Sequence, residues 1–311
     1  MQTLHIGVTC WKPENRWDAT TLCDQAGLAE QLGFDSYWLP ENHFGENAMP
    51  SPLTQLAAVS ACTSTIKLGT VSYLLPIRHP LQAAEEVAVV DQLCNGRLIL
   101  GLGRGIQDTM FSAFGVDSKD KRQRFSANLA LMRQAWTGDA IKTEGGTDDI
   151  RLSPLPVQNG GPPLWVAAFG PLALKQVAQL GLPYLASPME TLSELTANYT
   201  RFNTLVSEAK KPPVLTVPIM RTVFVHESSR LCGQVADALT RQAGKFRRTE
   251  TADIRDWTLI GDRHHVQDKI AEYQCKLEMT HLISSGRLPG LEAEIVMQSL
   301  ANLASLRLTQ R

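Results

Sequence analysis

The sequence predicts an α/β protein, a (β/α)8 barrel with loop insertions. Short apolar runs alternate with longer segments of helical period along the 311 residues. Eight such strand-and-helix units can be counted, whereas an open doubly wound sheet has about five or six strands. Because each crossover must return over one face of the sheet, the strands are expected to be parallel. No linker or sharp change of composition appears, so residues 1–311 are expected to form a single domain.

The predicted strands are short apolar runs bounded by turn residues. The first, LHIGVTC, is typical of a buried strand in a parallel sheet. In chain order they are Leu4–Cys10, Ser36–Leu39, Ile66–Leu75, Leu98–Gly101, Leu164–Ala168, Tyr184–Ala186, Val214–Val225 and Thr280–Ser284.

The predicted helices carry apolar residues at helical spacing, and several have recognisable ends. In the first helix Leu22 and Ala26 lie near one face, and Gly33 suits its C-terminal end. In the second, Ser51 is the expected N-cap and Pro52 takes the first helical position. In chain order the helices are Asp18–Leu32, Ser51–Cys62, Pro80–Cys94, Lys121–Trp136, about Leu172–Leu180, Thr191–Glu208, Ser228–Gln242 and about Leu291–Leu306.

Two segments interrupt the alternation, at about residues 138–161 and 244–258. The first is polar and rich in Gly and Pro, and could hold a small hairpin. The second contains the charged run GKFRRTETADIRDW, Gly244–Trp257. A long loop of this kind can form a lid over a site, or it can be a solvated excursion.

The composition excludes several classes of protein. A formal net charge of −1 and a pI of about 6.7 argue against a nucleic-acid partner. There is no apolar run of membrane-spanning length, and MQTLHIGVTCW lacks a basic stretch followed by a long apolar one, so no signal peptide is expected. The six cysteines form no CxxC pair, which favours a reduced, cytoplasmic protein. His264 and His265 are adjacent on an expected helix and point apart, so no metal site is expected.

The carboxyl ends of the strands are where a barrel carries its active site. The second strand ends in ENHF, residues 41–44. His43 could act as a general acid or a hydrogen-bond donor, and Glu41 could orient its ring or pair with an arginine. The alternative is a structural histidine.

Two further strand ends suit an anionic ligand. GLGRG at 101–105 lets the backbone approach a ligand closely, and Arg104 adds a guanidinium that can bind phosphate. Gly170 and Pro171 open a helix whose free N–H groups attract anions. The alternatives are a tight turn with a surface arginine and an ordinary strand-to-helix turn. Nucleophile-elbow, P-loop and HExxH motifs are absent from the sequence.

The chain resembles the bacterial luciferase-like family of flavin-dependent oxidoreductases along almost its whole length. The likeness is densest over IKLGTVSYLLPIRHPLQAAEEVAVVDQLCNGRLILGLGRG, 66–105, and continues through FGVD, 114–117, and AW, 135–136. Further matches are FDSYWLPENHF, 34–44, PPLWVAAFGPLALKQVAQLGLPYL, 162–185, and LIGDRHHVQDKIAEY, 259–273. The resemblance implies a barrel with flavin bound across its mouth.

The resemblance also implies site residues. Val71 and Ser72 match a non-proline cis peptide beneath the flavin ring, and Arg104 matches an arginine on the flavin phosphate, flanked here by Gly103 and Gly105. Arg122 matches a second basic position near the phosphate. Phe169 and Gly170, before Pro171, stand where the luciferases place an acid and a serine, so backbone N–H groups are expected to bind the anion.

The family's two-histidine motif is altered here. Asn42 replaces the first histidine, a key catalytic group in the luciferases, and His43 keeps the second. An asparagine can donate and accept hydrogen bonds but cannot transfer a proton at neutral pH. Both residues are expected at the catalytic centre, whereas light emission from an aldehyde is not.

The resemblance implies a monooxygenase. Reduced FMN, supplied by a separate flavin reductase, and molecular oxygen would oxidise a small organic substrate. The alternatives are a dehydrogenase or reductase that uses a deazaflavin coenzyme, and a non-catalytic flavin-binding subunit. The family usually pairs its subunits through early helices, so a homodimer is expected. The apolar helix Pro80–Cys94 could either pair with a second copy or pack on the barrel, and the sequence does not decide between these alternatives.

Overall fold

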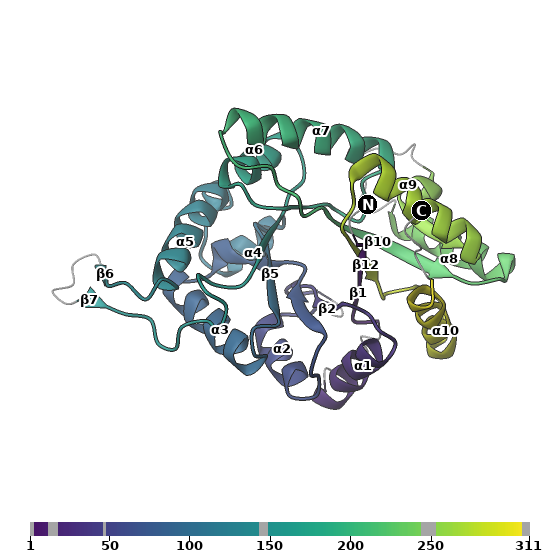
Figure 1. Ribbon diagram of the computed structural model, residues 1–311, viewed down its shortest axis with the longest axis horizontal. Coiled ribbons are helices and arrows are strands. Elements are labelled where there is room, and N and C mark those ends of the chain that lie inside the picture. The colour runs from purple at the N-terminus through teal and green to yellow at the C-terminus, as the bar shows by residue number, and fades with distance from the viewer. Residues whose placement is uncertain (1–2, 12–17, 46–47, 143–148, 244–252, 307–311) are drawn as a thin grey trace. The chain divides into compact units, whose positions relative to one another are not determined.

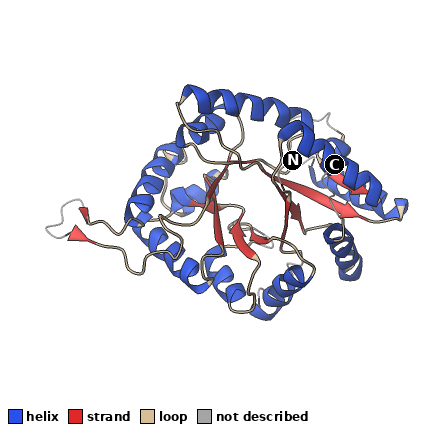
Figure 2. Ribbon diagram, viewed as in Figure 1, coloured by secondary structure: helices blue, strands red, loops and turns tan. Residues whose placement is uncertain are grey.

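The computed structural model describes residues 3–11, 18–45, 48–142, 149–243 and 253–306. Its contacts divide the chain into two compact units. Unit 1 comprises Met1–Glu14, Gly27–Trp38 and Ala168–Arg311, and unit 2 comprises Asn15–Ala26 and Leu39–Ala167. In each unit the helices line one side of the strands (Figure 2).

Unit 1 is built on a parallel sheet with the order β11-β10-β12-β1-β2, and β9 joins β10 through a bridge between Ala186 and Ile219. His5 and Val8 of β1 lie opposite His281 and Ser284 of β12. Because all these strands are parallel, their carboxyl ends lie at one edge of the sheet. The strands are β1 (His5–Thr9), β2 (Ser36–Leu39, whose last residue belongs to unit 2), β9 (Tyr184–Leu185), β10 (Pro218–Val225), β11 (Thr258–Gly261) and β12 (His281–Ser285).

The helices of unit 1 begin and end at residues that satisfy their free backbone groups. Thr191 and Glu194 form a capping box at the start of α7, and Asp262 accepts a hydrogen bond from the His265 N–H at the start of α9. The elements are α6 (Pro171–Leu180), α7 (Leu192–Glu208), α8 (Ser229–Ala243), the 3-10 turn η2 (Ile254–Asp256), α9 (Arg263–Leu277) and α10 (Ala293–Ala304). Helix α1 (Ala19–Gln31) begins in unit 2 and ends in unit 1.

Unit 2 contains the parallel strands β3-β5-β8, and β4 also pairs with β5. A short antiparallel hairpin, β6 with β7, projects from this unit (Figure 1); it lies in the polar segment where a hairpin was expected. The elements are α2 (Pro52–Ser60), β3 (Lys67–Thr70), β4 (Tyr73–Leu74), η1 (Leu75–Ile77), α3 (Pro80–Leu93), β5 (Leu98–Gly103), α4 (Asp108–Ala113), α5 (Lys121–Ala135), β6 (Ile141–Lys142), β7 (Asp149–Ile150) and β8 (Leu164–Ala167).

The structure corrects four details of the predicted elements. The predicted strand Ile66–Leu75 is interrupted between β3 and β4. Strand β11 and helix α4 were missed, because both are short and lie within polar sequence. Ser51 stands at the N-cap of α2, but with a φ of 54° and no side-chain capping bond. The eight predicted strands correspond to β1, β2, β3 with β4, β5, β8, β9, β10 and β12 of the described chain.

The expectation that all cysteines are reduced is wrong for one pair. Cys23 of α1 and Cys62, just after α2, form a disulfide within unit 2, with their Cα atoms 5.8 Å apart. Spacing in the sequence could not reveal this pair, because it depends on how the two helices pack. Cys10, Cys94, Cys232 and Cys275 are free thiols.

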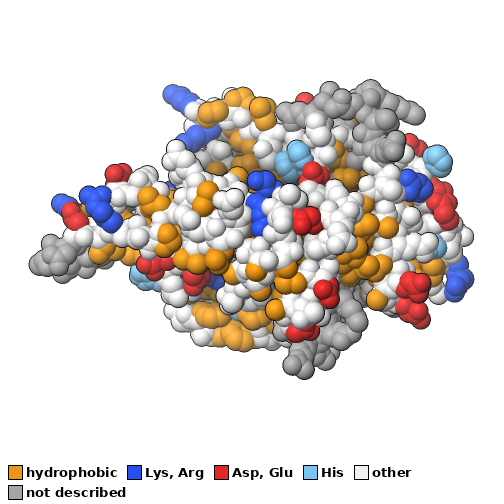
Figure 3. Space-filling view, turned by 60° about the horizontal axis from the view of Figure 1, so that its bottom comes forward, with side chains coloured by type: hydrophobic (Ala, Val, Ile, Leu, Met, Phe, Trp, Pro, Cys, Tyr) orange, Lys and Arg blue, Asp and Glu red, His pale blue; other side chains and the backbone are white. Residues whose placement is uncertain are grey.

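The charged segment expected to form a lid falls mostly outside the described residues, which resume at 253 with η2. No helix in the described ranges is both long and apolar enough to cross a membrane. On the face shown in Figure 3, basic and acidic side chains are both present and neither sign forms a broad field.

Candidate functional site

Glu41 is the centre of a buried polar cluster at the end of β2 in unit 2. Its side chain is 0% exposed. Its carboxylate accepts hydrogen bonds from His43 Nε2 at 2.9 Å, from the backbone N–H of Leu74 at 2.7 Å and from Arg78 Nη2. Burial by itself would raise the pKa of Glu41, but these bonds and the Arg78 charge outweigh it and lower the pKa below its usual value. The expectation that Glu41 orients His43 or pairs with an arginine is therefore confirmed on both counts.

The bond to Glu41 determines which nitrogen of His43 can react. A carboxylate only accepts hydrogen bonds, so His43 Nε2 carries the proton and Nδ1 of the neutral ring is an acceptor. The His43 side chain is 8% exposed, and its ring centroid lies 5.0 Å from that of Phe114 and 5.7 Å from that of Phe44. Since Phe44 is 72% exposed, the imidazole stands at the inner edge of an aromatic surface open to a ligand.

Asn42 is an exposed residue beside this cluster. The side-chain oxygen of Asn42 accepts a hydrogen bond from the backbone N–H of Met49. The backbone N–H of Asn42 donates to the Met49 carbonyl at 3.2 Å. The oxygen therefore serves to hold the loop after β2, while the amide NH₂ group can still donate to a ligand.

A cavity of about 360 Å³ adjoins His43. Arg78 stacks on Tyr73, with its Cζ atom 3.8 Å from the ring centroid, and the Tyr73 hydroxyl donates to Glu86 at 3.0 Å. Sequence reasoning missed these three residues as parts of a site, because η1 and the start of α3 bring them to the end of β2. The cavity is lined by His43, Pro50, Ser51, Leu53, Thr54, Tyr73, Ile77, Arg78, His79, Gln82, Ala83, Glu86 and Phe114.

The peptide bond between Val71 and Ser72 is cis, as the resemblance implies. The N–H of Val71 donates to the carbonyl of Leu39 at 2.9 Å. Opposite Ser72, a Cβ atom on Gly103 would lie 2.0 Å from the Ser72 hydroxyl. Position 103 must therefore be glycine for β5 to approach this peptide.

Arg104 follows β5 and lies near a second arginine. Its Nη2 donates to the carbonyl of Ala167 at 3.4 Å, at the end of β8. Burial first, and then the nearby Arg122 charge, lower the pKa of Arg104. Two guanidinium groups this close repel each other, so the pair favours a bound anion between or beside them. Gly105 has a φ of 75°, which a residue with a side chain rarely adopts.

Phe169, Gly170 and Pro171 belong to unit 1 and stand at the start of α6. Gly170 is the N-cap with a φ of 84°, and Pro171 is the first helical residue. Phe169 is 70% exposed. The helix N-terminus presents N–H groups that suit an anion, whereas Phe169 presents an aromatic ring to solvent.

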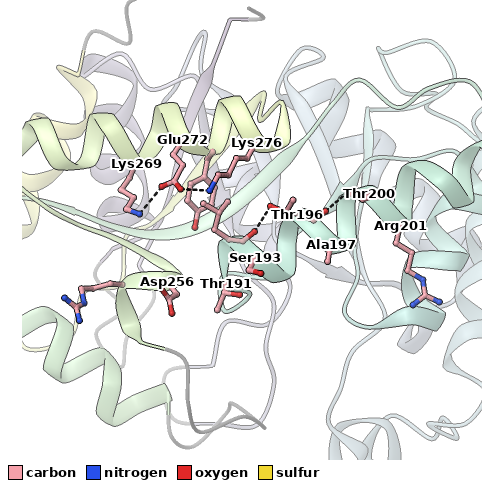
Figure 4. Close-up of a pocket in the computed structure, with 13 residues that line it drawn as sticks. Thr191, Ser193, Thr196, Ala197, Thr200, Arg201, Asp256, Lys269, Glu272 and Lys276 are labelled. Atoms are coloured by element: carbon pink, nitrogen blue, oxygen red, sulfur yellow. Dashed lines mark hydrogen bonds and ion pairs between the residues drawn. The ribbon is translucent and has the colours of Figure 1, made fainter.

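A second hollow lies in unit 1, between α7 and α9, with a volume of about 1050 Å³ (Figure 4). Three of its charged side chains pair with each other. Glu272 accepts from Lys269 at 2.9 Å and from Lys276 at 2.8 Å. Facing them, the hydroxyls of Thr196 and Thr200 donate to carbonyls within α7. Across the described ranges, no group of three or more His, Cys, Asp or Glu side chains is arranged to hold a metal ion.

Comparison with known proteins decides the family. The model of the family described as luciferase-like monooxygenase matches residues 6–277. The chain belongs to the luciferase-like monooxygenase family. The cis peptide after β3 and the glycine-arginine sequence at the end of β5 agree with what the resemblance to this family implies.

The luciferase-like relatives include oxygenases of known activity. The alkanal monooxygenase alpha chain of Photorhabdus laumondii is 28% identical over 185 residues, 58% of this chain and 52% of that protein. The oxygenase component of the flavin-dependent trigonelline monooxygenase of Acinetobacter baylyi is 25% identical over 211 residues, 65% of this chain and 58% of that protein. The chain thus matches about half the length of such relatives.

Solved structures with low sequence identity share the fold of this chain. The monooxygenase RslO1 of Streptomyces bottropensis superposes with a TM-score of 0.82 at 21% identity, covering 98% of this chain and 99% of that one. The oxygenating constituent of 3,6-diketocamphane monooxygenase of Pseudomonas putida, solved with FMN, gives 0.82 at 18% identity, with 97% of each chain covered. The coenzyme F420 dependent tetrahydromethanopterin reductase of Methanopyrus kandleri gives 0.71 at 18% identity, covering 97% and 98%. The predicted fold class, the (β/α)8 barrel of the luciferase-like proteins, is therefore confirmed.

Proposed function

We propose that this protein is an FMN-dependent monooxygenase that oxidises a small organic substrate with molecular oxygen. The observation that carries the proposal is the pair of guanidinium groups near the end of β5. Arg104 Nη2 donates to the Ala167 carbonyl at 3.4 Å, and the charge of Arg122 adds to burial in lowering the pKa of Arg104. The two groups adjoin a glycine that allows β5 to approach the cis peptide. This donor set fits a flavin phosphate, with the isoalloxazine ring over Val71 and Ser72. The resemblance to oxygenases that use flavin supports FMN as the ligand.

The chain's own residues would bind the flavin and orient the substrate. In unit 2, Gly103, Arg104, Gly105 and Arg122 would hold the flavin phosphate. In unit 1, the N-terminus of α6 at Gly170, just before Pro171, offers backbone N–H groups that suit an anion, and Phe169 offers an apolar ring. Bound in its reduced form, FMN supplies the electrons that activate oxygen. These assignments follow from the resemblance and from the polar chemistry of each residue.

His43 and Asn42 would contact the substrate or the reacting oxygen. With Nε2–H fixed on Glu41, His43 Nδ1 can accept a proton from the substrate and return it later. Asn42 can donate a hydrogen bond through its NH₂ group but cannot exchange a proton. The aromatic pair Phe44 and Phe114, with ring centroids 5.4 Å apart, would exclude water from this side.

A flavin titration tests the cofactor. FMN should bind with quenching of its fluorescence, and oxygen uptake with chemically reduced FMN should rise when the correct substrate is added. Absence of FMN binding would overturn the proposal. The coenzyme F420 dependent reductase among the structural relatives supports a second candidate, a deazaflavin-dependent dehydrogenase or reductase. Tighter binding of a deazaflavin than of FMN, with no oxygen uptake, would favour it.

The protein's partners are part of the same proposal. A separate flavin reductase would supply reduced FMN, because two of the similar proteins are named as the "oxygenase component" and the "oxygenating constituent" of their enzymes. The exposed Val89 and Leu93 on α3 support a homodimer through this helix, which light scattering would test.

We also propose that both units fold as one domain in the cytoplasm, with residues 138–161 and 244–258 as insertions. A non-catalytic flavin-binding subunit would bind FMN but show no substrate-dependent oxygen uptake.

A further inference from the structure

Arg287 is a cationic residue that the flavin assignment leaves unused. It follows β12 by two positions, at the edge of the unit 1 sheet where the parallel strands end. In a barrel this is the edge that carries the active site. The residue as a whole is partly exposed.

The backbone before Arg287 is held against the end of β1. The N–H of Gly286 donates to the Thr9 hydroxyl at 2.9 Å, and this bond is buried. A Cβ atom on Gly286 would lie 2.5 Å from the Thr9 carbonyl oxygen and 2.8 Å from Trp11 Cβ. Only glycine permits this close approach. The base of the Arg287 side chain is therefore fixed by packing.

Two of the three guanidinium nitrogens of Arg287 are buried and have no hydrogen-bond partner. These are Nε and Nη2. Within the described ranges no carboxylate lies within ion-pair distance of this side chain. Burying charged donors without a partner is strongly unfavourable, so a partner from outside the described chain is expected to pair with them.

The neighbouring group on β1 does not provide the missing charge. Burial raises the pKa of the Cys10 thiol to about 11, although the adjacent Arg287 guanidinium opposes this shift. At neutral pH Cys10 is therefore a neutral thiol, which is a weak hydrogen-bond acceptor. Among the residues that the structure describes, no ion pair compensates the positive charge of Arg287.

The identity of the two unpaired nitrogens indicates the shape of the missing partner. Nε–H and one N–H of Nη2 point in parallel from the same edge of the planar guanidinium. This edge binds the two oxygens of a carboxylate through two parallel hydrogen bonds. We propose that Arg287 is a specificity-determining residue that binds a carboxylate group of the substrate. The proposal rests on the oxidation proposed above, because it names the chemical class of that substrate.

The test uses acids and their uncharged amides as probes of the full-length protein. Benzoate with benzamide, and octanoate with octanamide, are titrated by calorimetry into the wild-type protein with and without FMN. At least one acid should bind saturably and at least tenfold more tightly than its amide. Equal affinity of acid and amide, or no saturable binding of either acid, would overturn the proposal.

Two variants locate the acid. Arg287→Gln should weaken acid binding at least tenfold and leave amide binding unchanged. Arg287→Lys should recover only part of the affinity, because an ammonium group cannot make two parallel bonds. Arg263→Gln is the matched control, since Arg263 donates to the Ser305 hydroxyl at 2.7 Å and should leave acid binding unchanged. Unaltered acid binding by a folded Arg287→Gln protein would contradict the proposal. If that variant does not fold, the wild-type comparison of acid with amide and the Lys variant still decide.

Flavin titrations separate this proposal from the proposed function. If Arg287→Gln weakens FMN but not riboflavin, and acids bind unchanged, Arg287 holds the flavin phosphate and the substrate assignment is wrong. If FMN fails to bind while acids bind through Arg287, the flavin assignment fails and the carboxylate site stands. If FMN binds normally but acids do not depend on Arg287, only the carboxylate site fails.

Discussion

The Glu41 carboxylate joins His43 to Arg78 at the end of β2. One oxygen, Oε1, accepts from both side chains, while Oε2 accepts from the Leu74 N–H at 2.7 Å. A single buried group thus fixes the tautomer of the imidazole and the position of the chain after the cis peptide. Glu41 acts through His43, and so it is a positioning residue.

Replacing Glu41 by Gln should change the chemistry of His43. The amide can accept only through its oxygen, and it removes the charge that stabilises an imidazolium ion. We expect substrate-dependent oxygen uptake to fall about 10- to 100-fold, the usual range for acid–base groups, and the pH profile of the reaction to shift. Stability should fall by about 1–3 kcal/mol, because Arg78 loses its charged partner. The exposed Glu85→Gln is the control. An unchanged pH profile for Glu41→Gln would exclude the positioning role.

Gly103→Ala should destabilise the protein. The added methyl group would lie 2.0 Å from the Ser72 hydroxyl and 3.1 Å from Leu74 Cδ2. Overpacking of this kind costs about 1–3 kcal/mol, measurable by urea unfolding. Gly27→Ala is the control, because Gly27 lies in α1 and nothing lies within 4 Å of the new Cβ atom. This substitution should raise the free energy of unfolding by about 0.5–1 kcal/mol. Equal stability of Gly103→Ala and wild type would show that β5 can move away.

Arg104→Ala should weaken FMN binding by about 1.5–3 kcal/mol, the usual contribution of a charge-assisted hydrogen bond. Fluorescence titration measures the change. Riboflavin, which has no phosphate, should bind the variant and the wild type alike. FMN affinity that stays the same in Arg104→Ala would remove this arginine from the phosphate site.

His281 should make stability depend on pH between about 6.5 and 4. Burial, and then the neighbouring His5 charge, lower the pKa of His281 from 6.5 to about 4 in the folded protein. The rings of the two histidines stack with centroids 4.9 Å apart. Between these pH values the unfolded chain binds a proton that the folded chain does not. The contribution of His281 to the free energy of unfolding is therefore fully present above about pH 6.5 and is lost as the pH falls toward 4.

Urea unfolding at pH 7 and pH 4.5 measures this effect. The loss due to His281 should be of the order of 1–3 kcal/mol. The variant His281→Asn should reduce the loss, because its side chain does not titrate in this range. A loss of the same size in His281→Asn and wild type would assign the pH dependence to other groups.

The disulfide between Cys23 and Cys62 should stabilise unit 2. It closes a sequence separation of 39 residues, and reducing it should lower the free energy of unfolding by about 2–4 kcal/mol. The double variant Cys23→Ser, Cys62→Ser should be insensitive to reductant and serves as the control. A wild-type unfolding curve that dithiothreitol leaves unmoved would show that the bond contributes nothing.

Local sequence features were sufficient to predict most of the fold. Strand β2 and the starts of α3 and α5 have the predicted bounds, because apolar period and proline position depend only on neighbouring residues. The sequence also predicted that the candidate residues lie at the ends of strands, because parallel strands present their carboxyl ends at one edge of the sheet. Strand β11 was missed, because TLIG is four residues long and follows a charged segment.

The sequence by itself determined the alternating architecture, the family and the residue types that we propose bind a flavin. Only the tertiary structure decided which of them act together. Glu41 and Arg78 are 37 positions apart. The surroundings of the Arg287 side chain depend on how β1 and β12 end side by side. Hydrogen bonding and burial of charge are set by contacts between distant segments, and no local pattern of residues encodes those contacts.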